Sequence, residues 1–150
     1  MEKNNLPVQA NLINGDWVKS EERKETINPA TGEVIGYYYE PNEDHLKEAI
    51  SVAKDTFDHS DWKDDRELRA RALNELADQI ESRKDELIEL IAKENGKIAP
   101  EAEFEFSLTP SKLRYYAALA LSDQGKSAEV KKGAYSRLVS EPIGVAGVIV

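Results

Sequence analysis

The chain has 150 residues, of which 33% are charged, and a formal net charge of −9. This length suits one ordinary domain, and the acidic balance argues against nucleic acid as a partner, because phosphate backbones are bound through lysine and arginine. No apolar run approaches the ~20 residues that cross a bilayer, residues 1–5 lack the apolar core of a signal peptide, and the absence of cysteine excludes disulfides and fits a cytoplasmic protein.

A hairpin is predicted near the start of the chain. The segment Leu12–Val18 places Asn14 and Gly15 between apolar residues, and an Asn-Gly pair supplies the positive φ angles of a type I′ turn. The charged stretch 19–24 predicts a solvated loop after this hairpin.

A second pair of strands is predicted on either side of a turn. Thr26-Ile27 indicates a short strand, and Val34–Tyr39 is β-branched and aromatic, as strands are. Between them, Asn28–Gly32 predicts a turn, because Pro29 fixes φ and Gly32 tolerates the reversal. We expect a small antiparallel sheet of three or four strands over these residues.

Helical periodicity begins after Pro41, with Asn42 as a good N-cap. A second helix, capped by Ser60 or Asp61, is predicted to run from about Trp62 to Asn95 and to stop at Gly96. The apolar residues of the first helix recur at helical spacing at Leu46, Ala49, Ile50, Ala53 and Phe57.

A third helical segment is predicted to start near Pro100, and Pro110 interrupts its periodicity. Two structures are compatible with this pattern. The helix kinks at Pro110, or Thr109 caps a new helix with Pro110 in its first turn. The sequence does not choose between them.

The last part of the chain changes character twice. Residues 122–133 are polar, and Tyr135, Arg137 and Val139 then alternate with other residues as in a half-exposed strand. The final residues 143–150 are almost wholly apolar, which is typical of a strand in a parallel sheet covered on both faces. We therefore predict a strand there.

The residues alone indicate no active site. His45 and His59 lie in acidic surroundings and are interpreted as surface histidines. Gly144 and Gly147 do not form a Gly-x-Gly-x-x-Gly loop, and no helix follows them to bind a phosphate. These patterns support a soluble α+β domain and assign no chemistry.

Six segments, in order, resemble the NAD(P)-dependent aldehyde dehydrogenase superfamily. They cover residues from about 12 to 150, and their joint order and spacing carry the resemblance more than any one match. The segments are Ile13-Asn14-Gly15-Asp16-Trp17, Ile27-Asn28-Pro29-Ala30-Thr31-Gly32-Glu33, Arg69-Ala70 through Ile80-Glu81, Glu94-Asn95-Gly96-Lys97, Arg114-Tyr115-Tyr116-Ala117 and Glu141-Pro142-Ile143-Gly144-Val145-Ala146-Gly147-Val148-Ile149.

The resemblance implies an α/β, aldehyde dehydrogenase-like fold. In this chain that fold comprises a small antiparallel sheet, long amphipathic helices, and the start of an oligomerisation arm and of the cofactor-domain sheet. Residues 1–124 would be the amino-terminal part of the NAD(P)-binding domain. Residues 125–142 would belong to the arm, and 143–150 would be the first, truncated strand leading to the cofactor site.

The resemblance also implies oxidation of an aldehyde to a carboxylic acid with NAD or NADP through a cysteine thioester. Since the chain has no cysteine, we interpret it as an amino-terminal fragment that is inactive alone and contains no catalytic residue. The alternative is a non-enzymatic truncated product that acts as an interaction or structural module. The complete protein is expected to be a homodimer or homotetramer.

Two groups of binding residues follow from the same resemblance. Ile149 and Val150 match the strand end that approaches the cofactor. Thr26, Ile27 and Glu94 match positions that in some members bind a monovalent cation, and backbone carbonyls with one carboxylate suit a hard cation.

Overall fold

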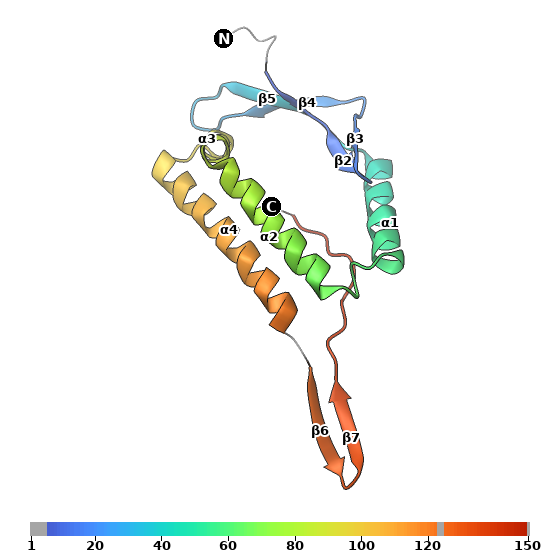
Figure 1. Cartoon of the computed structure of the whole chain (residues 1–150). Helices are drawn as coiled ribbons and strands as arrows, with labels where there is room; N and C mark the ends of the chain where they lie inside the picture. The colour runs from blue at the N-terminus through green and yellow to red at the C-terminus, as the bar shows by residue number, and fades with distance from the viewer. Residues whose placement is uncertain (1–5, 123–124, 150) are drawn as a thin grey trace.

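The computed structural model describes residues 6–122 and 125–149 as two small β-units at one end of a helical layer and a β-ribbon at the other (Figure 1). The three-stranded sheet has the order β1-β5-β4, and the other strands form the pairs β2-β3 and β6-β7. The elements, in chain order, are β1 (Val8–Gln9), β2 (Asn11–Ile13), β3 (Asp16–Val18), β4 (Arg23–Ile27), β5 (Val34–Tyr39), α1 (Glu43–His59), α2 (Arg66–Ser82), α3 (Lys84–Asn95), α4 (Ala99–Ser122), β6 (Lys126–Lys131) and β7 (Ala134–Leu138).

The β2-β3 hairpin confirms the Asn-Gly prediction. Leu12 pairs with Trp17 across the hairpin, and the turn residues Asn14 and Gly15 have φ angles of 53° and 85°. These are the positive angles that a type I′ turn requires.

The expectation of a single antiparallel sheet is wrong in two respects. The hairpin forms its own two-stranded ladder, and β1 joins β5 in parallel, with Val8 beside Tyr37. A strand of two residues is too short to show alternation in the sequence. The predicted loop 19–24 is also shorter than expected, because Arg23 and Lys24 belong to β4. This strand lies at the sheet edge, where charged side chains oppose unwanted pairing.

Helix α1 begins as predicted at the N-cap Asn42. Its side-chain oxygen accepts a hydrogen bond from the backbone N–H of His45 at 3.0 Å. In return, the Asn42 backbone N–H donates to Nδ1 of His45 at 3.2 Å. His45 therefore completes a capping box, a place usually taken by glutamate or glutamine, and has a structural task beyond that of a surface histidine.

The single helix predicted from Trp62 to Asn95 is wrong. Arg83, with φ −110° and ψ 24°, separates α2 from α3. Apolar spacing continues on both sides of this residue, so periodicity does not reveal a break of one residue. The N-cap prediction is also wrong, since Asp65 caps α2 by accepting from Leu68, and Ser60 instead ends α1.

Helix α4 is continuous through Pro110, which contradicts the alternative of a new helix capped by Thr109. Pro110 is buried on the same face as Phe106. A proline inside a helix removes one backbone hydrogen bond at a cost of about 3 kcal/mol or more. Packing of this buried face against α2 compensates for that loss.

The core lies between α2 and α4, and small residues dominate it. Ala77 and Ala102 have no exposed surface, and Ala117 is 1% exposed. Side chains of this size let two helices approach closely. The buried apolar residues in the described part of the chain are Ile13, Ala70, Ala77, Ala102, Phe106 and Ala117.

Ion pairs border this interface and show that α2 and α4 are antiparallel. Arg114 donates to Asp78 at 2.8 Å and to Glu81 at 2.6 Å, while Glu103, earlier in α4, meets Lys84 at 3.2 Å. Hydrogen bonds to Asp78 and then Glu81 raise the pKa of the Arg114 guanidinium. These exposed pairs fix the register of the two helices more than they stabilise them.

Residues 143–149 form no regular secondary structure, so the strand predicted over 143–150 is not found there; Val150 lies outside the described residues. An apolar strand requires hydrogen-bonding neighbours, and no described strand pairs with this segment. None of the helices in the described ranges is long and apolar enough to cross a membrane.

We expect the Ala77→Leu substitution to destabilise the fold by about 1–3 kcal/mol, because added methylene groups overpack a closed helix interface. The matched control Ala118→Leu lies on the exposed side of α4 and should change stability by no more than about 0.5 kcal/mol. Urea unfolding followed by circular dichroism measures both. Equal losses in the two variants would contradict the assigned core.

Candidate functional site

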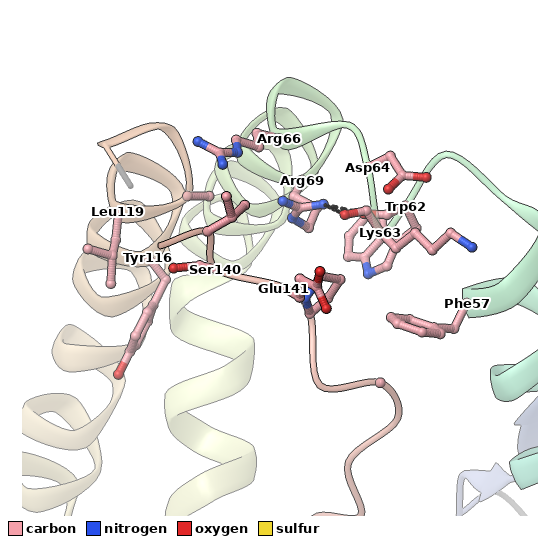
Figure 2. Close-up of a pocket in the computed structure, with 14 residues that line it drawn as sticks. Phe57, Trp62, Lys63, Asp64, Arg66, Arg69, Tyr116, Leu119, Ser140 and Glu141 are labelled. Carbon is pink, nitrogen blue, oxygen red and sulfur yellow. Dashed lines mark hydrogen bonds between the residues drawn. The ribbon is translucent and has the colours of Figure 1, made fainter. Parts of the chain in front are cut away.

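A cavity of about 620 Å³ lies where four segments meet. Figure 2 shows Phe57 at the end of α1, the α1–α2 connection, the start of α2, the later part of α4 and the segment around Glu141 surrounding it. Its wall is both aromatic and charged, with Trp62, Tyr116 and Arg66 among the lining residues.

Arg69 organises one wall of this cavity. Its guanidinium donates to the carbonyl of Trp62 and, at 2.9 Å, to that of Lys63. Lys63 in turn donates from Nζ to the Asp58 carbonyl at 2.8 Å. A guanidinium has several donors in a fixed fork, so one side chain satisfies two loop carbonyls and holds the α1–α2 connection against α2 (Figure 2).

The cavity offers contacts for binding but no catalytic pair. Neither histidine nor cysteine lines it, and the donors of Arg69 are directed at backbone carbonyls. Nucleophilic catalysis requires a nucleophile beside a base. The arrangement is therefore suited to the packing of a chain segment or the binding of a ligand.

The predicted cation residues Thr26 and Ile27 end strand β4. Thr26 is half-buried, and Ile27 is 50% exposed. A register shift interrupts the β4-β5 ladder at these two residues. The turn that follows is held by the Asn28 side chain, which accepts from the Ala30 N–H at 2.9 Å, and by the Gly32 N–H, which donates to the Asn28 carbonyl at 2.8 Å.

This turn is docked on Gly96, which ends α3 as predicted with a φ of 65°. A Cβ atom at Gly96 would lie 2.9 Å from Cγ of Pro29 and 3.0 Å from the backbone nitrogen of Ala30. The docking brings the turn after Thr26-Ile27 to the helix end that carries the exposed Glu94. Helix carboxyl ends favour cations, although no group of three or more metal-binding side chains occurs in the described ranges.

The predicted cofactor residues are not assembled into a site. Ile149 is fully exposed, and Val150 lies outside the described residues. Gly144 and Gly147 lie in a segment without regular structure, and no described helix follows them. Pyrophosphate binding uses backbone N–H groups at a helix start, so the described residues do not by themselves fit a dinucleotide.

The predicted arm forms the β6-β7 ribbon, which projects from the far end of the helices (Figure 1). The sequence indicated a strand only around Tyr135 to Val139, because β6 is a run of mixed polar residues without clear alternation. In the ribbon, Glu129 pairs with Tyr135 and its side chain accepts from the Gly133 N–H at 2.7 Å. Every residue of β6 is exposed.

Comparison with known proteins was made on the sequence and on the fold. The aldehyde dehydrogenase family model matches residues 17–150. The NADP(+) succinate-semialdehyde dehydrogenase 2 of Schizosaccharomyces pombe is 33% identical over 143 residues, which are 92% of this chain and 29% of that protein. An aldehyde dehydrogenase of Davidiella tassiana is 32% identical over 93% of this chain and 28% of its own length.

Solved structures agree with the sequence comparison. Betaine aldehyde dehydrogenase of Staphylococcus aureus, crystallised with NAD+, superimposes with a TM-score of 0.83 at 28% identity, covering 89% of this chain and 27% of that one. An NAD-dependent aldehyde dehydrogenase of Sinorhizobium meliloti gives a TM-score of 0.82 at 23% identity, covering 89% of this chain and 28% of that one, and supports the fold alone.

We expect Gly96→Ala to destabilise the chain more than Gly32→Ala does. Both glycines have positive φ, which costs a residue with a Cβ about 1–2 kcal/mol. Only Gly96 also faces Pro29 and Ala30, whereas a Cβ at Gly32 meets nothing within 4 Å. The extra loss at Gly96 should be about 1–3 kcal/mol in urea unfolding. Losses of equal size would show that the turn is not docked on the helix end.

Proposed function

The chain belongs to the aldehyde dehydrogenase family, and we propose that it forms the amino-terminal part of an enzyme that oxidises an aldehyde to a carboxylic acid with NAD or NADP. The observation that carries this proposal is the agreement of fold and sequence over nearly the whole chain, with a TM-score of 0.83 over 89% of it. We further propose that the enzyme is cytoplasmic, which the lack of cysteine supports.

The exposed surface of α4 supports a place inside a larger protein. Phe104 and Tyr115 are 67% and 62% exposed, and Leu108 and Leu119 are 41% and 45% exposed. Their spacing of four, seven and four residues places them on one face of the helix, opposite the face that packs on α2. The chain spans about 28% of the length of the relatives it matches, so the remaining polypeptide of such an enzyme can cover this face.

The chemical steps are proposed to lie outside this chain. A cysteine thiolate would attack the aldehyde to form a covalent adduct, and the nicotinamide, when bound, accepts a hydride. Water then releases the acid from the thioester. This chain has no cysteine, so its part is to form helical layers beside the cofactor domain, and Arg69 contributes by fixing the α1–α2 connection.

We expect the 150-residue chain to show no aldehyde-dependent formation of NADH or NADPH at 340 nm, because it cannot form the thioester. The matched control is the product of the full reading frame, assayed with the same aldehydes. Turnover by the short chain would contradict the proposed division of labour. A stop codon directly after Val150 would favour the alternative of a non-enzymatic interaction or structural module, for which the absent cysteine is the supporting observation.

We also propose a monovalent cation at the carbonyls of Thr26 and Ile27 and the carboxylate of Glu94. The docking of the turn on Gly96 supports this proposal because it brings the ends of β4 and α3 together. Oxygen ligands of this kind suit a hard cation, and the partial negative charge at the end of α3 adds to the attraction.

The cation proposal predicts that sodium or potassium chloride raises the melting temperature above that in tetramethylammonium chloride at equal ionic strength. A cation at ten times its dissociation constant stabilises the fold by about 1.4 kcal/mol. Glu94→Gln should abolish the difference between the salts, whereas Glu75→Gln, which removes the same charge from an exposed site on α2, should preserve it. No difference between the salts in the parent chain would refute the site.

Finally, we propose that the β6-β7 ribbon joins subunits into a homodimer or homotetramer. The ribbon is exposed, and both of its outer edges lack a described partner strand. Backbone N–H and C=O groups on such edges are available to pair with another chain.

A further inference from the structure

The root of the β6-β7 ribbon contains an unusually close backbone approach. Gly125 is the first residue described after α4, and its φ is +71°. A Cβ atom at this position would lie 2.5 Å from the carbonyl oxygen of Leu138, the last residue of β7. Side chains do not tolerate that separation, so only glycine permits this contact.

The other end of the ribbon provides an internal comparison. Gly133, in the turn between β6 and β7, has a φ of +77°, yet a Cβ there would meet nothing within 4 Å. Both glycines satisfy a left-handed backbone. Gly125 additionally permits the two chain segments at the root to touch, which Gly133 does not need to do.

The root contact joins the two segments that connect the ribbon to the helices. On the entry side, Gly125 follows α4 closely in the sequence. On the exit side, Val139 and Ser140 line the cavity together with Tyr116 and Leu119 of α4. Since the ladder begins at the pair Lys126 and Leu138, contact at Gly125 makes the ribbon continue directly from two anchored segments.

We propose that Gly125 is a steric lock that fixes the direction in which the β6-β7 ribbon leaves the helices and so presents the ribbon to a second copy of the chain. The second half of this statement rests on the proposed role of the ribbon in joining subunits. The first half concerns the geometry of one chain and is tested separately.

The direction of the ribbon can be measured with two spin labels, because the chain has no cysteine of its own. Lys112→Cys on α4 and Lys131→Cys near the ribbon tip place the labels at exposed sites. Dilution with unlabelled chain removes distances between molecules. The parent should give one narrow distance distribution, and Gly133→Ala should preserve it.

Gly125→Ala is expected to broaden or shift this distribution, because the new methyl group drives the two segments at the root apart. An unchanged distribution in Gly125→Ala would overturn the proposal. Amide hydrogen exchange in β6 and β7 shows whether the ribbon itself remains paired. As a second variant, two glycines inserted between Leu138 and Val139 loosen the root without adding a Cβ, and a narrow distribution there would also overturn the lock.

Sedimentation of the same unlabelled chains tests the link to assembly. Replacement of residues 126–138 by a short Gly-Ser linker tests the role of the ribbon, and no change in the oligomeric state would refute that role while leaving the spin-label result valid. If the linker variant loses self-association, Gly125→Ala should weaken it at least tenfold and Gly133→Ala should not. Self-association of Gly125→Ala at parental strength would overturn the second half of the proposal.

Discussion

The close packing of α2 on α4 is the constraint on which the rest of this chain depends. Alanine at facing positions, with Ala77 and Ala102 fully buried, allows two antiparallel helices to meet with little side-chain volume between them. Dispersion forces favour such contact because many atoms lie at optimal separation. The cavity is built on the start of α2 and the later part of α4, and the ribbon continues from the end of α4, so this pair sets the position of both.

The sequence predicted the elements whose signal is local. The Asn14-Gly15 turn, the Asn42 cap and the Gly96 stop each rest on the chemistry of one or two residues, and the structure confirms all three. Elements that depend on distant partners were predicted less well. The parallel pairing of β1 with β5 joins residues almost thirty positions apart, and no local pattern announces it.

The errors in the helices and at the candidate site have the same origin. Apolar periodicity does not detect the break at Arg83, since the residues on either side keep their faces. The sequence identified Thr26, Ile27 and Glu94 only through family resemblance. The contact of Pro29 and Ala30 with Gly96 arises between segments distant in the chain, so their relation becomes visible only in the folded molecule. Arg69 gave no signal of its two carbonyl contacts, because arginine on a helix is ordinarily solvent-facing.

The buried proline of α4 has a consequence for the order in which the chain folds. In an isolated peptide, Pro110 would divide this segment into two short helical stretches, each too short to be stable in water. The continuous helix from Ala99 to Ser122 is therefore a product of tertiary docking. Nucleation belongs to α2, and α4 completes its central turn only after that template has formed.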